Sequence, residues 1–141
     1  MNIVNDIKEA KIEKIIAGGG NGSIILIDLI KDNNKYVVYI YCAWRLSLDD
    51  KILTGWNDID IVFVTELKKL ENDMIDNITS NSLGDFTLLF KSGIKLEVFC
   101  DITSNINNTS IDENWSFCDI SKNQCYNFTN QFLFLVEPYE R

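Results

Sequence analysis

Residues 84–100 read Gly84-Asp-Phe-Thr-Leu-Leu-Phe-Lys-Ser-Gly-Ile-Lys-Leu-Glu-Val-Phe-Cys100 and predict a β-hairpin. A three-residue loop over residues 91–93 places apolar side chains opposite one another on one face of the hairpin. The opposed pairs are then Phe90 with Ile94, Leu88 with Leu96, and Phe86 with Val98. Such a loop requires a left-handed backbone at its third residue, so we expect Gly93 to have a positive φ.

A similar pattern occurs roughly sixty residues earlier in the chain. In the first unit a strand, a glycine turn and a hairpin end at Cys42, and in the second unit the same elements end at Cys100. We therefore expect an α+β, mainly β fold of two similar antiparallel units, about residues 11–47 and 73–119, which form a pseudo-twofold internal repeat. A short helix joins the two units, and both share one core in a single domain of residues 1–141.

The rest of the chain predicts short elements around these units. Residues 2–10 have helical spacing and predict one short helix, with a longer helix through Ala17 as the alternative. Thr65 is a candidate N-cap for a linking helix over residues 66–74. The other predicted elements are strands at residues 23–30, 36–44, 115–118 and 131–136, turns at residues 18–22 and 31–35, and an exposed loop at residues 103–114.

The composition is that of a globular protein, with 46% hydrophobic and 24% charged residues among 141. No apolar run approaches the roughly eighteen residues of a membrane-spanning helix, so we expect no membrane partner. Residues 1–8 lack the pattern of a signal peptide, and we expect a cytoplasmic protein. In that compartment Cys42, Cys100, Cys118 and Cys125 are expected to be reduced structural thiols, with two disulfides as the alternative.

The net charge is -8 and the pI is about 4.4. Nucleic-acid binding needs lysine and arginine to replace counterions on phosphates, so we expect no nucleic-acid partner. The acidity favours a basic protein partner, and its alternative explanation is solubility alone. Because the chain contains no histidine, histidine-dependent triads and dyads are excluded.

The best candidate for chemistry is the stretch Gly55-Trp-Asn-Asp-Ile-Asp-Ile-Val-Phe-Val64. On a strand, Asp58 and Asp60 point to the same face and offer oxygen ligands to a divalent metal. The pair resembles the Asp-x-Asp strand of nucleotidyltransferases of the minimal type, which implies a metal-dependent nucleotide-handling enzyme. The Gly-Ser dipeptide that this family has shortly upstream is absent here. Polar alternation on a half-exposed strand explains the two aspartates equally well, so we expect no metal and no other cofactor.

The three tryptophans are candidates for an aromatic binding surface. We expect Trp44 and Trp115 to pack in the core at equivalent places in the two units, and Trp56 to lie in a turn and be the most exposed. The candidate binding residues are therefore Trp56, Asn57, Asp58 and Asp60.

The motifs Trp44-Arg-Leu46, Ile52-Leu-Thr-Gly55 and residues 85–99 are similar to those of a widespread group of uncharacterised small bacterial proteins. Genes of that group often resemble immunity or accessory components of toxin systems. The resemblance implies a non-enzymatic, acidic, immunity-type inhibitor that covers the active surface of a basic toxin. Two further hypotheses are an enzyme built on Asp58 and Asp60, and a structural homodimer that pairs through a strand edge or an apolar patch.

Overall fold

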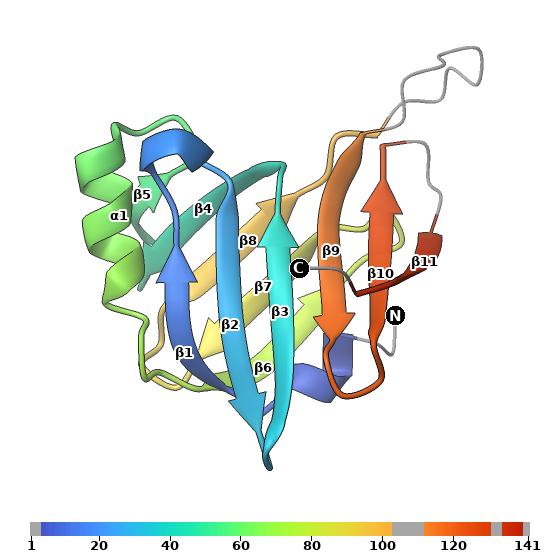
Figure 1. Cartoon of the computed structure of the whole chain (residues 1–141). Coiled ribbons are helices and arrows are strands. Elements are labelled where there is room, and N and C mark those ends of the chain that lie inside the picture. Colours follow the sequence, from blue (N-terminus) through green and yellow to red (C-terminus); the bar gives the residue numbers. More distant parts are fainter. Residues whose placement is uncertain (1–3, 103–111, 131–133, 140–141) are drawn as a thin grey trace.

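Two antiparallel β-sheets face each other across one shared core (Figure 1). The computed structural model describes residues 4–102, 112–130 and 134–139. In these residues the larger sheet has six strands, in the order β1 (Lys11–Ile16), β2 (Ile25–Lys31), β3 (Asn34–Ile40), β9 (Glu113–Asp119), β10 (Gln124–Thr129) and β11 (Phe134–Pro138). The smaller sheet has five strands, in the order β5 (Lys51–Gly55), β4 (Ala43–Leu48), β8 (Lys95–Phe99), β7 (Phe86–Phe90) and β6 (Ile75–Ser80).

Helical segments connect and flank the two sheets. They are the 3₁₀ helices η1 (Val4–Ile7) and η2 (Gly19–Asn21) and the α-helix α1 (Asp60–Lys68). α1 lies beside β1 and β5, which are edge strands of the two sheets, and so closes one side of the sandwich (Figure 1). Within the described ranges, no helix has the length and apolar character needed to cross a membrane.

The chain exchanges hairpins between the two sheets. β1, β2 and β3 form one side of the larger sheet, and the chain then crosses to add β4 and β5 to the smaller sheet. β6, β7 and β8 form one side of the smaller sheet, and the chain then crosses back to add β9 and β10 to the larger sheet. This two-sheet, mainly β architecture confirms the predicted fold class, and its topology is compatible with the predicted internal repeat.

Trp44 and Trp115 occupy corresponding places in the two halves. Trp44 is opposed to Val98 on β8, and Trp115 is opposed to Ile40 on β3. Both tryptophans are buried, as predicted, and each donates its Nε1–H to a backbone carbonyl just before the second strand of its own half. The acceptors are Ser23, at 2.8 Å from Trp44, and Gly84, at 2.9 Å from Trp115. A buried indole N–H without a partner is costly, so these bonds help to fix how each half packs.

The β7–β8 hairpin has the register that the sequence predicts. Leu88 is opposed to Leu96, and the Phe90 N–H donates to the carbonyl oxygen of Ile94 at 2.9 Å. Gly93 has a φ of 92°. These observations confirm the predicted three-residue loop. The physical reason for this register is that it places the apolar partners together on the core face.

The linking helix begins and ends earlier than predicted. α1 covers Asp60–Lys68, and Thr65 is not its N-cap but lies inside it, where its hydroxyl donates to the carbonyl oxygen of Ile61 at 2.6 Å. The β-branched residues here favour a strand. A contact distant in sequence overrides that preference, because the Phe63 ring packs edge-on against Trp44 with ring centroids 5.9 Å apart.

Several other predicted bounds are wrong. Residues 36–44 are two strands, because the chain leaves the larger sheet after β3 and joins the smaller sheet at β4. The short N-terminal helix is η1, and β1 excludes the longer helix through Ala17. β5 and β10 are not predicted. On β10 the core-facing Tyr126 and Phe128 alternate with Asn127, which lies on the outer face beside Cys125 and weakens the apolar signal of the strand. Of the predicted loop, residues 103–111 lie outside the described residues, and Asn114 is buried in β9. Of the predicted last strand, residues 131–133 also lie outside them, and β11 continues to Pro138.

Cys118 and Cys125 form a disulfide between β9 and β10. They are directly opposed in the strand register, and they join Val37 in a small buried cluster separate from the main core. The prediction of reduced thiols is therefore wrong for this pair, because opposed cysteines on antiparallel strands are close enough to bond. Cys42 and Cys100 are free thiols, as predicted.

We expect the substitution Gly84→Ala to destabilise the protein by at least about 2 kcal/mol. Gly84 has a φ of 86°, and an added Cβ would collide with the ring of Phe128. Gly20→Ala is the matched control, because a Cβ there meets nothing within 4 Å, and it should change the free energy of unfolding by less than about 0.5 kcal/mol. Urea denaturation measures both variants, and equal midpoints would contradict the close packing at Gly84.

Candidate functional site: a polar groove on the smaller sheet

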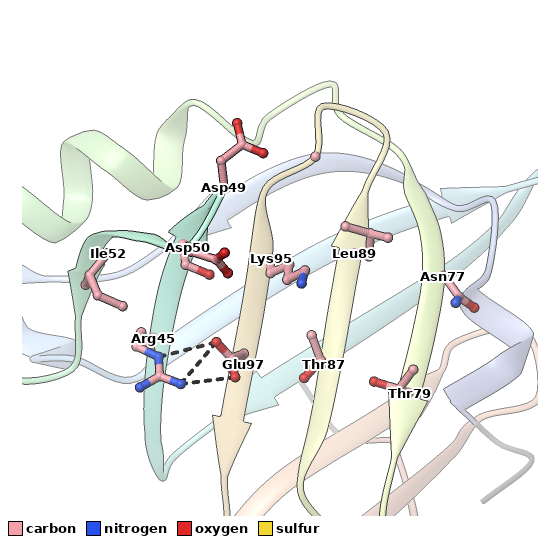
Figure 2. A pocket seen from close by; sticks show the side chains of 12 residues that line it. Arg45, Asp49, Asp50, Ile52, Asn77, Thr79, Thr87, Leu89, Lys95 and Glu97 are labelled. Carbon is pink, nitrogen blue, oxygen red and sulfur yellow. Dashed lines mark hydrogen bonds and ion pairs between the residues drawn. The ribbon is translucent and has the colours of Figure 1, made fainter.

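The outer face of the smaller sheet is hollowed into a groove with a volume of about 820 Å³ (Figure 2). Side chains of β4, β8, β7 and β6 form its floor, and the turn between β4 and β5 forms part of its rim. We call this surface the polar groove. Its lining residues are Arg45, Ser47, Asp49, Asp50, Ile52, Asn77, Thr79, Thr87, Leu89, Gly93, Lys95 and Glu97.

The polar groove follows from the alternation of side chains along each strand. On β8, Leu96 is fully buried in the core, while its neighbours Lys95 and Glu97 point to the outer face. β7 alternates in the same way on either side of the buried Leu88. The same period of two therefore determines both the core face and the groove face of this hairpin.

The outward side chains form two rows that run across the strands (Figure 2). In each row, every residue is directly opposed to the next one on the neighbouring strand. The first row is Arg45, Glu97, Thr87 and Thr79. The second row is Ser47, Lys95, Leu89 and Asn77. Opposed Cβ atoms lie about 4.5–5.5 Å apart, so each row is a continuous strip of side chains.

A bidentate ion pair between Arg45 and Glu97 occupies one end of the first row (Figure 2). The Nη2 of Arg45 donates to both Glu97 oxygens at 3.1 and 3.2 Å, and its Nε donates to Oε1 at 3.3 Å. The guanidinium carbon also lies 5.0 Å from the ring centroid of Phe99. The two charged side chains are 44% and 27% exposed, so water screens the pair while the ring and the fork geometry orient it.

Lys95, Asp49 and Asp50 carry the other charges of the polar groove. The two aspartates have φ values of 49° and 62°, which a two-residue hairpin loop of type I′ requires. In the part of the chain that the structure describes, Lys95 forms no ion pair, so its ammonium group can meet a ligand. With Glu97 included, the carboxylates of the groove outnumber its cations.

These side chains can form hydrogen bonds and ion pairs with a ligand. The hydroxyl and amide groups donate and accept hydrogen bonds, and the two cations can meet carboxylate or carbonyl oxygens. The chain has no histidine to act as a general base. Across residues 4–102, 112–130 and 134–139, no three side chains of histidine, cysteine, aspartate or glutamate are grouped so that they could hold a metal ion.

The binding residues predicted from sequence lie elsewhere, in the connection between β5 and α1 and at the first residue of α1. Trp56 is 36% exposed, whereas Trp44 and Trp115 are buried, so the predicted ranking of the three tryptophans is confirmed. Asn57 is exposed as well. None of these residues lines the polar groove.

Asp58 and Asp60 do not lie on one strand, as the metal hypothesis requires. Asp60 is the first residue of α1, and its Oδ2 accepts the Gly19 N–H at 3.1 Å. The Oδ2 of Asp58 accepts the hydroxyl of Thr54 at 2.9 Å. The strand placement is wrong because α1 begins here, and the two carboxylates bond to different parts of the fold.

The polar groove is not predicted from the sequence, although the hairpin that forms its centre is. The pattern of residues 86–99 identifies the inward pairs, and the same pattern places Thr87, Leu89, Lys95 and Glu97 on the opposite face. The pairing of β4 with β8 has no signal in the sequence, because the two strands are far apart in the chain. Without β4, neither row reaches Arg45 or Ser47.

Comparison of the chain with protein-family models, with curated proteins and with solved structures found no match in any of the three. No relative therefore assigns a role to a residue of the polar groove. Its geometry and charge are the observations that bear on function.

We expect Arg45 and Glu97 to be weakly coupled. In a double-mutant cycle of Arg45→Ala and Glu97→Ala, the coupling free energy should be about 0.2–1 kcal/mol, because water reaches both side chains. Urea denaturation of the four proteins at low and high salt measures this coupling, which should shrink as salt is added. A coupling that salt leaves unchanged would contradict a solvent-screened pair.

Proposed function

We propose that this chain is a non-enzymatic binding protein and that the polar groove holds a segment of a protein partner. The observation that carries the proposal is the pair of side-chain rows across β4, β8, β7 and β6. Neighbouring strands lie about 4.8 Å apart, so a row across four strands is roughly 14 Å long. An extended peptide rises about 3.3 Å per residue, so each row has the length of roughly four residues of a bound segment.

The side chains of the rows match the needs of such a segment. The backbone of an extended peptide presents both N–H and C=O groups, and Thr79, Thr87 and Asn77 can pair with either kind. Leu89 adds an apolar contact in the middle of the second row. Specific interfaces combine such apolar centres with a polar surround.

We infer that the partner is basic. The chain has a net charge of -8, and Asp49, Asp50 and Glu97 bring part of that charge to the groove. Opposite charges on the two proteins would speed their encounter and make it sensitive to salt. An acidic inhibitor of a basic toxin, which covers the toxin's active surface, is the specific form of this proposal, and the net charge of -8 supports it.

Blocking the centre of the polar groove should abolish binding of the partner. Thr87 lies between Glu97 and Thr79 in the first row. The substitution Thr87→Tyr places an aromatic ring over the groove, and tyrosine is a residue type that is common in strands. Gln124→Tyr is the matched control, because Gln124 is exposed on β10 of the larger sheet. Wild type and both variants serve as bait in a lysate of the native cell. Wild type and Gln124→Tyr should retain the same basic protein at low salt and release it at high salt, and Thr87→Tyr should not retain it.

Calorimetry with the captured protein then gives the dissociation constant of each variant. Thr87→Tyr should raise this constant at least about tenfold, which corresponds to roughly 1.4 kcal/mol. Circular dichroism and urea denaturation establish that all three proteins are folded. Equal affinities for the three proteins would place the binding surface outside the groove, and an affinity independent of salt would contradict the charge mechanism.

A further inference from the structure

The two free cysteines lie where the chain crosses between the sheets. Cys42 stands between β3 and β4, and Cys100 directly follows β8. The last pair of the β4–β8 ladder is Ala43 opposite Phe99. In an antiparallel register, Cys42 and Cys100 are therefore the next opposed pair.

Hydrogen bonds hold both crossings in this register. The backbone carbonyl of Asn114 accepts the Tyr41 N–H at 2.9 Å. The Asn114 side chain accepts the Asp101 N–H at 2.9 Å and donates to the Asp101 carbonyl oxygen at 3.0 Å. The Cys100 N–H donates to Asp85 Oδ1 at 2.6 Å. Tyr41 and Asp101 are the direct neighbours of the two cysteines, so the backbone is fixed on both sides of the pair.

The Cys42 side chain affects the ionisation of the Cys100 thiol. A hydrogen bond with the Cys42 side chain, together with burial, raises the pKa of the Cys100 thiol. Opposed residues on antiparallel strands have Cα atoms about 4.5–5.5 Å apart, within the range of about 4.4–6.8 Å that a disulfide spans. Cys118 and Cys125 have the same opposed placement on β9 and β10, and they are bonded.

We propose that Cys42 and Cys100 are a second disulfide site, which closes by exchange with a small-molecule disulfide such as oxidised glutathione. Cys100 is the more accessible of the two, and because its pKa is raised, its loss of a proton limits the rate. The Cys100 thiolate then attacks one sulfur of the reagent and releases the first glutathione thiolate. The Cys42 thiolate then attacks the Sγ of Cys100, forms the Cys42–Cys100 bond and releases the second glutathione thiolate. The two protons lost by the cysteines pass to the two released thiolates, and the two electrons reduce the disulfide of the reagent.

The new bond would join the two halves of the molecule at the place where they exchange hairpins. It closes a loop that contains every strand from β4 to β8, so it restricts the unfolded chain. The ion pair of Arg45 and Glu97 lies farther along the same two strands and points to the outer face, so the polar groove keeps its form.

The test treats the full wild-type chain with oxidised glutathione in mildly alkaline buffer, which raises the thiolate fraction. Remaining thiols are then alkylated in denaturant, and the protein is analysed by intact mass and by peptide mapping. We expect both free thiols to be lost without retained glutathione, and the Cys42 peptide to be linked to the Cys100 peptide. The oxidised protein should also unfold at a higher urea concentration than protein not treated with the reagent.

Single variants distinguish this pair from unselective oxidation. Cys42→Ala should keep glutathione on Cys100, because no second thiol is there to displace it. Cys100→Ala should leave the buried Cys42 unmodified and show no change of urea midpoint on treatment. A wild-type protein that keeps both thiols, retains glutathione on Cys100, or links either cysteine to Cys118 or Cys125 would overturn the proposal.

Discussion

The two crossings of the chain between the sheets are the constraint on which the rest of the fold depends, and Asn114 holds both of them. Its backbone carbonyl bonds to Tyr41 in one crossing, and its side chain bonds to both backbone groups of Asp101 in the other. Asn114 is only 3% exposed, so water cannot replace these bonds. A buried polar group that loses its partner costs about 1–3 kcal/mol. A single asparagine therefore links the two places where one half of the chain enters the sheet of the other half.

The exchange of hairpins makes the core common to both halves. Each sheet contains strands from both sides of α1, so the two halves of the chain cannot separate without breaking the β3–β9 and β4–β8 ladders. Trp44 and Trp115 contribute large buried rings from the exchanged hairpins and bond back to the half from which each hairpin came. Cooperative unfolding of the whole chain is the physical consequence, because neither half retains a complete sheet of its own.

Sequence predicts this structure well where both partners of a contact are close in the chain. The β7–β8 hairpin is such a case, because apolar pairs such as Leu88 with Leu96 and the glycine at residue 93 define one loop. The start of α1 is predicted six residues too late, because Ile61, Val62 and Val64 favour a strand, and long-range packing such as that of Phe63 on Trp44 overrides this preference. The polar groove is not predicted either, because it depends on the pairing of β4 with β8, which joins residues that are distant in the sequence.

The two sheets correspond in topology but differ on their outer faces, and this difference favours the smaller sheet as the binding surface. On the larger sheet, Val37 and the Cys118–Cys125 disulfide form a buried apolar cluster, and Tyr139 packs against it. Burial of this apolar cluster stabilises the fold. On the smaller sheet, the two outward rows contain a single aliphatic side chain, Leu89, among polar and charged ones. The outward rows and the core pairs behind them lie on opposite faces of the same strands, so residues of the rows can change while the core pairs stay the same.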